Sequence, residues 1–179
     1  MFVDVLVKPA RAITLCALTA GLIGCAGDSS KPSGSPSFYQ SMARPDVTLD
    51  AQAAAAMISG YRRNNGLGGV ALDPHLMRMA EAQARAMAAR NKLDHDVGGR
   101  FHERIRRSGY DAKVAVENIG AGYHTLAEAF SGWRDSPPHR ANMLHRGVTK
   151  MGIAAAYAPG SKYKVFWALI LAAPDDRRG

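Results

Sequence analysis

The chain has 179 residues, with 23 lysines and arginines against 15 aspartates and glutamates, and only two cysteines. This length suffices for one domain whose core needs no disulfide staples. The formal net charge of +8 indicates either an anionic partner or a solvated basic surface.

An apolar run of 12 residues, Ala12–Ile23, follows the basic residues Lys8 and Arg11 near the start of the chain. A membrane-spanning helix needs roughly 20 apolar residues, so the pattern predicts a secretory signal. The sequence Leu-Ile-Gly-Cys at 22–25 resembles the lipobox of bacterial lipoproteins. The resemblance implies a lipoprotein signal peptide over residues 1–24 and a diacylglycerol on Cys25. A simple secretory peptide is the alternative.

An acylated Cys25 would anchor the protein to a membrane of the bacterial cell envelope, because two acyl chains give stable anchoring. Ala26 follows it, whereas an aspartate there is the inner-membrane retention signal of the class that the motif resembles, so we expect the outer membrane. Cys16 lies in the discarded segment. No thiol then remains for a disulfide, a thiolate metal site or a nucleophile, so the domain must be held together by packing.

Residues 25–45 are polar and rich in Gly, Ser and Pro, which predicts a flexible tether about 25 Å long. A domain is expected over residues 46–173, followed by a charged tail over 174–179. The arginine clusters at 62–63, 100–107 and 177–178 are interpreted as solvated surface. Outside the cytoplasm such a surface would contact anionic lipid headgroups or acidic glycans. We therefore expect a monomer with no nucleic-acid partner.

Three helices are predicted in the first half of the domain. Thr48 or Asp50 is placed to cap the first, which ends near residue 64. Asp73, with Pro74 at the first helical position, begins a second that ends near residue 91. A shorter third helix is expected over residues 100–108, with apolar side chains at 101 and 105 facing inward.

The second half of the domain is expected to contain strands. Residues 113–119 alternate loosely and predict a short strand or extended segment, and a capping box at 125–128 opens a fourth helix that residues 136–138 stop. Two strands, over 151–158 and 163–172, flank a Pro-Gly-Ser-Lys turn and predict an antiparallel hairpin. Helices first and strands last predict an α+β domain with an antiparallel sheet and about four helices.

His95 and His139 are the candidate functional histidines, because both lie among turn-forming residues. Glu117 lies between them in the sequence, in an extended stretch that ends in glycines. Loop positions supported by packed elements are where sites tend to be built. These residues lack the i, i+4 spacing of metal ligands on a helix, so the local sequence gives little indication of zinc.

Four segments follow one another in a characteristic order. They are the helix over 72–91 leading into Asp-His-Asp at 94–96, Glu-Asn-Ile-Gly-Ala-Gly at 117–122, Trp-Arg-Asp-Ser-Pro-Pro-His-Arg-Ala-Asn-Met-Leu at 133–144, and Met-Gly-Ile-Ala at 151–154. In this order and spacing they resemble the CAP superfamily (cysteine-rich secretory proteins, antigen 5 and pathogenesis-related proteins). The resemblance is to the disulfide-free bacterial SCP-like branch, and it covers residues 48–172.

The resemblance implies an α-β-α sandwich with a cleft lined by two His and two Glu side chains. The matching positions are His95, Glu117 and His139. The second glutamate is replaced by Ser136, as is common in bacterial members. Its neighbour Asp135 is offset by one residue, which on a helix turns a side chain by roughly 100°, so we do not expect Asp135 to substitute.

Three interpretations of these residues stay open. Some family members bind zinc through the two histidines, and two imidazoles with Glu117 could hold a divalent cation and a water. The same groups could form an acid–base set in which Glu117 raises the pKa of a neighbouring imidazole. They could also form a buried hydrogen-bonded network that fixes the loops. A hydrolase also needs a nucleophile, and Ser136, the nearest hydroxyl to His139 in sequence, lacks the Gly-x-Ser-x-Gly context.

The sequence thus predicts an envelope-anchored CAP/SCP-domain lipoprotein. Because eukaryotic family members bind sterols or fatty acids, our leading hypothesis is a non-enzymatic protein whose cleft binds a lipid, another amphiphile or a protein partner. The rival is a metal-assisted hydrolase of peptide or cell-wall substrates that uses His95, Glu117 and His139. A third option is a basic face that binds anionic envelope polymer, with a vestigial cleft.

Overall fold

The computed structural model describes residues 35–175, so Cys25, the signal peptide and the predicted tether before residue 35 lie outside it. Its elements in chain order are the 3-10 helix η1 (Ser37–Tyr39), α1 (Ala51–Asn64), β1 (Ala71–Leu72), α2 (Pro74–Arg90), α3 (Phe101–Ser108), β2 (Ala112–Ala121), α4 (Leu126–Asp135), α5 (Pro137–Met143), β3 (Lys150–Tyr157) and β4 (Val165–Pro174).

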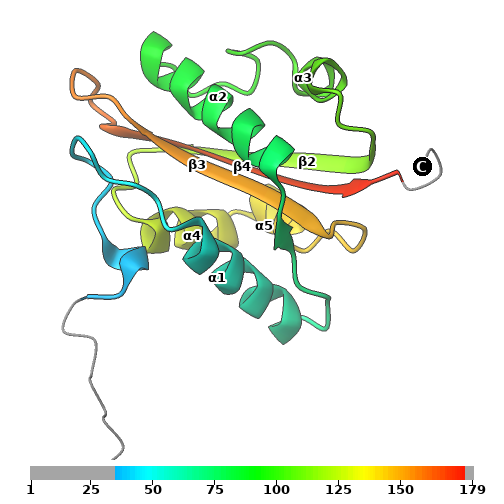
Figure 1. Cartoon of the computed structure of the whole chain (residues 1–179). Helices are drawn as coiled ribbons and strands as arrows, with labels where there is room; N and C mark the ends of the chain where they lie inside the picture. Colours follow the sequence, from blue (N-terminus) through cyan, green and yellow to red (C-terminus); the bar gives the residue numbers. More distant parts are fainter. Residues whose placement is uncertain (1–34, 176–179) are drawn as a thin grey trace, which may run out of the picture. The chain divides into compact units, whose positions relative to one another are not determined.

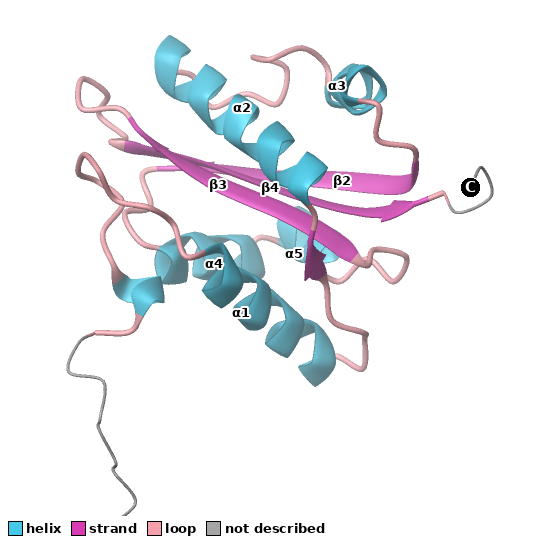
Figure 2. Cartoon of the chain, viewed as in Figure 1, coloured by secondary structure: helices cyan, strands magenta, loops and turns pink. Residues whose placement is uncertain are grey.

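The four strands form one sheet in the order β1-β3-β4-β2. Helices α2 and α3 cover one face of it, and α1, α4 and α5 cover the other (Figure 1). Figure 2 shows the three layers by element type. The central strand β4 is buried from Val165 to Ala173 and runs antiparallel to both β2 and β3. The predicted α-β-α sandwich and α+β class are confirmed.

The helix starts follow from capping side chains, as the sequence predicts. Asp50 accepts a hydrogen bond from the amide of Ala53, and Asp73 accepts from the first amides of α2. Thr125 and Glu128 form the expected capping box at the start of α4. Each cap satisfies amides that the first turn of a helix leaves without partners.

Besides η1, which lies in the segment predicted as a tether, two elements were not predicted. The prolines at Pro137 and Pro138 end α4 but also begin α5, because a proline in the first helical turn gives up an amide that has no partner there. Strand β1 is only two residues long and pairs parallel with β3, through Ala71 with Lys150 and Leu72 with Met151. So short a strand leaves no periodic pattern in the sequence.

The domain begins earlier than the predicted boundary at residue 46. Within the part assigned to the tether, Phe38 packs against the core beneath the sheet and Met42 is buried. The Met42 amide donates to the carbonyl of His124 at 2.7 Å, and Ser37 donates to Asp50. Two apolar side chains in an otherwise polar stretch are enough to bind this segment to the domain.

The end of the domain also differs slightly from the prediction. Strand β4 extends through Pro174, and the amide of Asp175 donates to the carbonyl of Asp111 at 2.9 Å. The first two residues of the predicted charged tail are therefore part of the domain, and residues 176–179 lie outside the described range.

Helix α2 lies directly on the sheet at Gly152. A Cβ at this position would lie 2.0 Å from the carbonyl carbon of Leu76, a backbone atom that cannot move aside. Leu76 is fully buried in the core between α2 and the sheet. The missing side chain of Gly152 therefore sets the distance between the helix and the sheet.

We predict that Gly152→Ala lowers the free energy of unfolding by about 3 kcal/mol or more, because the added methyl must push α2 off the sheet. Urea denaturation of the unit Gly34–Gly179 measures this change. The control is Gly160→Ala, which adds the same methyl in open space and should be nearly neutral. Equal stabilities of the two variants would contradict the proposed close contact.

Arg62 is buried, in contrast to our prediction of a solvated basic face at residues 62–63. Its guanidinium donates to the carbonyl oxygens of Gly68, Met143, His145 and Val148, at distances from 2.8 to 3.1 Å. Burial lowers the pKa of its side chain from the ordinary value. This one side chain ties the end of α1 to the loop between α5 and β3.

Arg62→Met should lower the free energy of unfolding by about 3–5 kcal/mol, because buried carbonyl oxygens lose a charged donor. Chemical denaturation is again the measurement. Arg63→Met, at the exposed neighbouring position, should change the stability by less than about 0.5 kcal/mol. A loss of similar size in both variants would show that the charge, and not the buried hydrogen bonds, is responsible.

Candidate functional site

Glu117 lies in the middle of β2 and is 6 % exposed. Its Oε1 is 2.8 Å from Nδ1 of His95, and each of its oxygens is 2.8 Å from Nη2 of Arg104. An ionised carboxylate only accepts hydrogen bonds, so Nδ1 of His95 is the donor. Both oxygens of Glu117 are thus engaged by cationic or donor groups.

Arg104 reaches Glu117 because α3 lies beside β2 on the same face of the sheet (Figure 1). Its side chain is only 10 % exposed, and its guanidinium lies over the ring of Phe101, 5.2 Å from the centroid. The same guanidinium donates to the carbonyl oxygens of Gly99 and His95 at 2.8 and 3.1 Å. Arg104 therefore fixes both the carboxylate and the loop that carries the histidine.

The loop after α2 is held from the helix side by Gln83. This buried amide donates to the carbonyl oxygens of Asp94 and His95 at 3.0 and 3.1 Å. The loop starts at Asn91, whose left-handed conformation (φ 49°) turns the chain at the end of α2. The position of His95 is thus fixed by main-chain contacts before its ring meets Glu117.

Helix α5 meets the same strand from the other layer. Asn118 donates to the carbonyl of His139 at 3.0 Å, and its side-chain oxygen accepts from Asn142 at 2.9 Å. Asn142 also donates to the main-chain carbonyl of Glu117 at 3.1 Å. Because β2 is an edge strand of the sheet, groups from both helical layers meet along its free side.

The two histidines have opposite electrostatic surroundings. The hydrogen bond and charge of Glu117 raise the pKa of His95 from the ordinary value of 6.5, against the opposing effect of burial. Burial lowers the pKa of His139, and the positive charge of His95 lowers it further. As the pH falls, His95 is therefore protonated before His139.

The structure brings His95 and Glu117 into direct contact, as predicted, and His139 close enough to sense the charge of His95. Within residues 35–175, no group of three His, Cys, Asp or Glu side chains is arranged to hold a metal ion. Zinc binding through His95 and His139 therefore stays a prediction. Glu117, the third proposed ligand, has both oxygens hydrogen-bonded to Arg104.

Ser136, the position of the absent second carboxylate, lies between α4 and α5, and Asp135 pairs with Arg134 at the surface. Asp135 thus does not replace the missing acid, as expected. We had placed Arg104 on a solvated basic face. The sequence already argued against a solvated Arg104. It follows Phe101 by three residues and precedes Ile105 by one, and this spacing places it on the inward side of α3.

The model of the CAP (Cysteine-rich secretory protein) family matches residues 55–171, which include every side chain of this cleft. The chain belongs to the CAP family. It is 29 % identical over 99 residues to YkwD of Bacillus subtilis, across 54 % of this chain. The chain spans 38 % of the length of that protein.

Solved structures show the same fold. An extracellular protein with an SCP domain from Bacillus anthracis matches at a TM-score of 0.59 and 24 % identity, over 68 % of this chain and 39 % of that one. An outer surface protein of Borrelia burgdorferi matches at a TM-score of 0.65 and 17 % identity, over 73 % of this chain and 96 % of that one.

We predict that the contribution of His95 to stability is present in full below pH 6.5 and is lost as the pH rises through the raised pKa of the folded state. The wild type should therefore be more stable than His95→Gln at pH 6, and this difference should shrink by pH 8.5. Because the ring is about half exposed, the effect is at most about 1 kcal/mol. Urea denaturation across this pH range measures it.

His139→Gln is the matched control, and its sign is opposite. Because the pKa of His139 is lowered in the folded state, protonation below pH 6.5 favours the unfolded chain. His139→Gln should therefore be more stable than the wild type below pH 6.5 and equally stable at alkaline pH. Parallel pH profiles of the wild type and both variants would contradict the assigned electrostatics.

Proposed function

We propose that this CAP-domain protein is a non-enzymatic binding protein of the bacterial cell envelope, which holds an anionic ligand at the free edge of β2. The observation that carries the proposal is the engagement of both Glu117 oxygens by Arg104 and His95. The acid of the cleft is satisfied within the protein. What the cleft offers a ligand is N–H donors and positive charge.

The chemistry of the edge supports an anion. The side chain of His95 is 49 % exposed, and its second ring nitrogen is the one not used on Glu117. In the neighbouring helix, Arg106 and Arg107 have no ion-pair partner among the described residues, whereas Arg100 pairs with Glu103 and Arg104 with Glu117. Hydrogen bonds between protonated imidazole or guanidinium groups and a carboxylate or phosphate are among the strongest that proteins make. A carboxylate or phosphate group of an envelope lipid or polymer fits this chemistry.

The proposed location rests on the N-terminal segment and on the structural neighbours. The neighbours with the same fold include an extracellular protein and an outer surface protein, which supports export of this chain. None of the helices within residues 35–175 has the length and apolar character to cross a bilayer. Membrane attachment is therefore proposed through acylation of Cys25, with the outer membrane as the favoured site.

The hydrolytic alternative needs a metal or a nucleophile activated in the cleft. Glu117 is poorly placed for either task, because a cation would be repelled by Arg104 beside it and both carboxylate oxygens already accept hydrogen bonds within the protein. Ser136 is a half-buried residue of the turn between α4 and α5. The geometry therefore favours binding over catalysis.

An apolar chain also has a place to bind, which favours an amphiphile as a second candidate ligand. A hollow of about 620 Å³ lies between η1 and α1, lined by Phe38, Ala53, Ala56 and Met57 among others. Helix α1 belongs to the helical layer opposite the one that contains α2 and α3 (Figure 1). A single amphiphile would therefore not place its tail in this hollow and its anionic group at His95, so the two candidate ligands need separate tests.

We predict that the unit Gly34–Gly179 binds vesicles of phosphatidylglycerol or the acidic polymer polygalacturonate more tightly than phosphatidylcholine vesicles. His95→Gln should weaken this binding about tenfold, because one charge-assisted hydrogen bond is lost. Co-sedimentation at pH 6 and pH 8 measures it, and binding should fall with rising pH as His95 loses its proton. The two anionic probes distinguish a headgroup from a polymer.

Arg63→Gln is the control for charge alone, since this exposed arginine lies on α1 in the opposite layer. It should bind nearly as well as the wild type. Equal losses of affinity in His95→Gln and Arg63→Gln would show that the binding depends only on net charge. Stoichiometric zinc by elemental analysis, lost together with peptide or cell-wall hydrolysis in His139→Ala, would replace the binding proposal with the hydrolase.

A further inference from the structure

Strand β3 has a free edge on the side opposite the β2 site. Strand β1 covers this edge only at Lys150 and Met151, whereas β3 continues to Tyr157. From Gly152 onward, within residues 35–175, the sheet has no further strand on this side. The free stretch is roughly 17 Å long at about 3.3 Å per residue.

The main chain of the free stretch has groups that point out of the sheet. The amide of Asp73 donates to the carbonyl of Met151, and the amide of Ile153 donates to the sulfur of Met77 at 3.3 Å. Because the direction alternates along a strand, the amides and carbonyls of Ala155 and Tyr157 face the same way. A thioether is a weak acceptor, so a peptide carbonyl would displace it readily.

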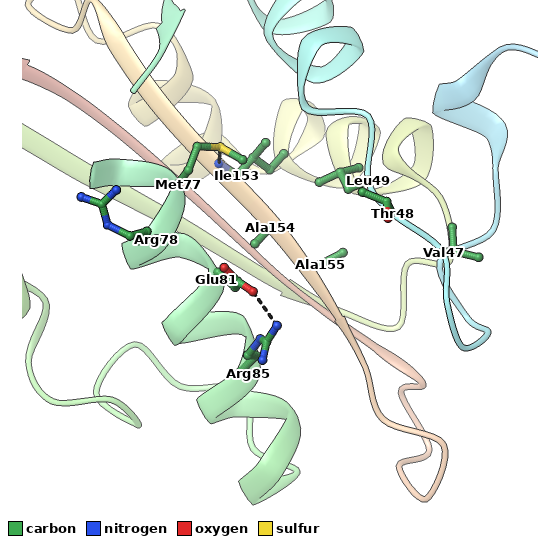
Figure 3. A pocket seen from close by; sticks show the side chains of 10 residues that line it. All are labelled: Val47, Thr48, Leu49, Met77, Arg78, Glu81, Arg85, Ile153, Ala154 and Ala155. Carbon is green, nitrogen blue, oxygen red and sulfur yellow. Dashed lines mark hydrogen bonds and ion pairs between the residues drawn. The ribbon is translucent and has the colours of Figure 1, made fainter. Parts of the chain in front are cut away.

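The free edge lies at the bottom of a groove. Figure 3 shows Val47–Leu49 along one side of it and the α2 side chains Arg78, Glu81 and Arg85 along the other. This hollow measures about 350 Å³, and a second of about 350 Å³, which shares Glu81, Arg85 and Ala155 with it, is lined by β3 as far as Tyr157.

The side chains of β3 leave its backbone accessible. Residues 154–156 are three consecutive alanines, all partly exposed, so no large side chain covers the edge. A segment lying in the groove would therefore meet the peptide groups of β3 directly. Main-chain pairing with β3 is the contact that this shape allows.

We propose that this groove binds an extended, acidic peptide segment of another protein, which adds to the sheet as a fifth strand along Ile153–Tyr157. Main-chain hydrogen bonds to Ala155 and Tyr157 supply the pairing, as in other strand-addition complexes. Arg85 is ion-paired with Glu81, whereas Arg78 has no ion-pair partner among the described residues. A carboxylate of the peptide fits beside Arg78.

The shape of the groove argues against a second copy of this chain as the occupant. The edge is recessed between Val47–Leu49 and α2, and a second copy would bring the same two walls to meet them. Only a slender extended segment reaches the bottom. The β3 groove and the pair His95–Glu117 lie on opposite sides of the central strand β4, so the peptide proposal does not depend on the proposed anion site.

The test is selection from a pool of random seven-residue peptides on the immobilised unit Gly34–Gly179, which contains both cores of the domain. We expect enriched peptides that favour extended structure and share one acidic position. Amide hydrogen exchange of Ala155 and Tyr157 should slow by tenfold or more when such a peptide is bound.

Two variants locate the binding. Ala155→Pro removes one outward amide, which an edge strand tolerates because that amide has no partner in the sheet, and should weaken binding at least tenfold. Arg78→Glu leaves the backbone untouched and should weaken binding by a similar factor, whereas Arg63→Glu on α1 should not. If Ala155→Pro fails to fold, Arg78→Glu and the exchange measurement decide.

Failure to enrich any peptide, enrichment of helical or basic peptides, or undiminished binding to Arg78→Glu would overturn the proposal. So would a wild-type dimer, seen by sedimentation and abolished by Ala155→Pro, because the edge would then belong to a second copy. Loss of anion binding at His95 would leave this result unaffected.

Discussion

A carboxylate buried in an edge strand must have its charge balanced, and this requirement organises one side of the molecule. Glu117 is nearly inaccessible to water, so its oxygens need hydrogen-bond donors from within the protein. Arg104 and His95 meet this demand and thereby fasten α3 and the loop after α2 to the sheet. Removing either partner would leave a buried charge poorly compensated.

Much of the fold follows from local chemistry that the sequence displays. The caps at Asp50, Asp73 and Thr125 locate three helix starts, and the alternating apolar residues locate the long strands. What escaped prediction depends on tertiary contacts. The burial of Phe38 and Met42 is visible only once α1 and α4 are in place beside them, and β1 exists only because β3 lies next to it.

The site shows the same division. The resemblance to the CAP family placed His95, Glu117 and His139 at one cleft, and the structure confirms the contact between the first two. The resemblance did not include Arg104, which we interpreted as solvated surface because it lies in a basic stretch, although its spacing from Phe101 places it on the inward side of α3. Arg62 was also interpreted as solvated surface because it lies next to a second arginine, whereas its side chain is buried. Whether an arginine is buried depends on carbonyl groups more than 80 residues away in sequence, at Met143 and His145.

The two edges of the sheet are protected against pairing with other strands by different means. This protection matters if the protein is concentrated on a membrane, as we propose. Unpaired strand edges are templates for aggregation. On β2 the side chain of Asn142 covers the carbonyl of Glu117, so the edge is capped by α5. On β3 the edge is sunk below its flanks instead. Pairing between the sheets of neighbouring copies crowded in two dimensions is therefore hindered at both edges, although the backbone of β3 stays accessible to a slender segment.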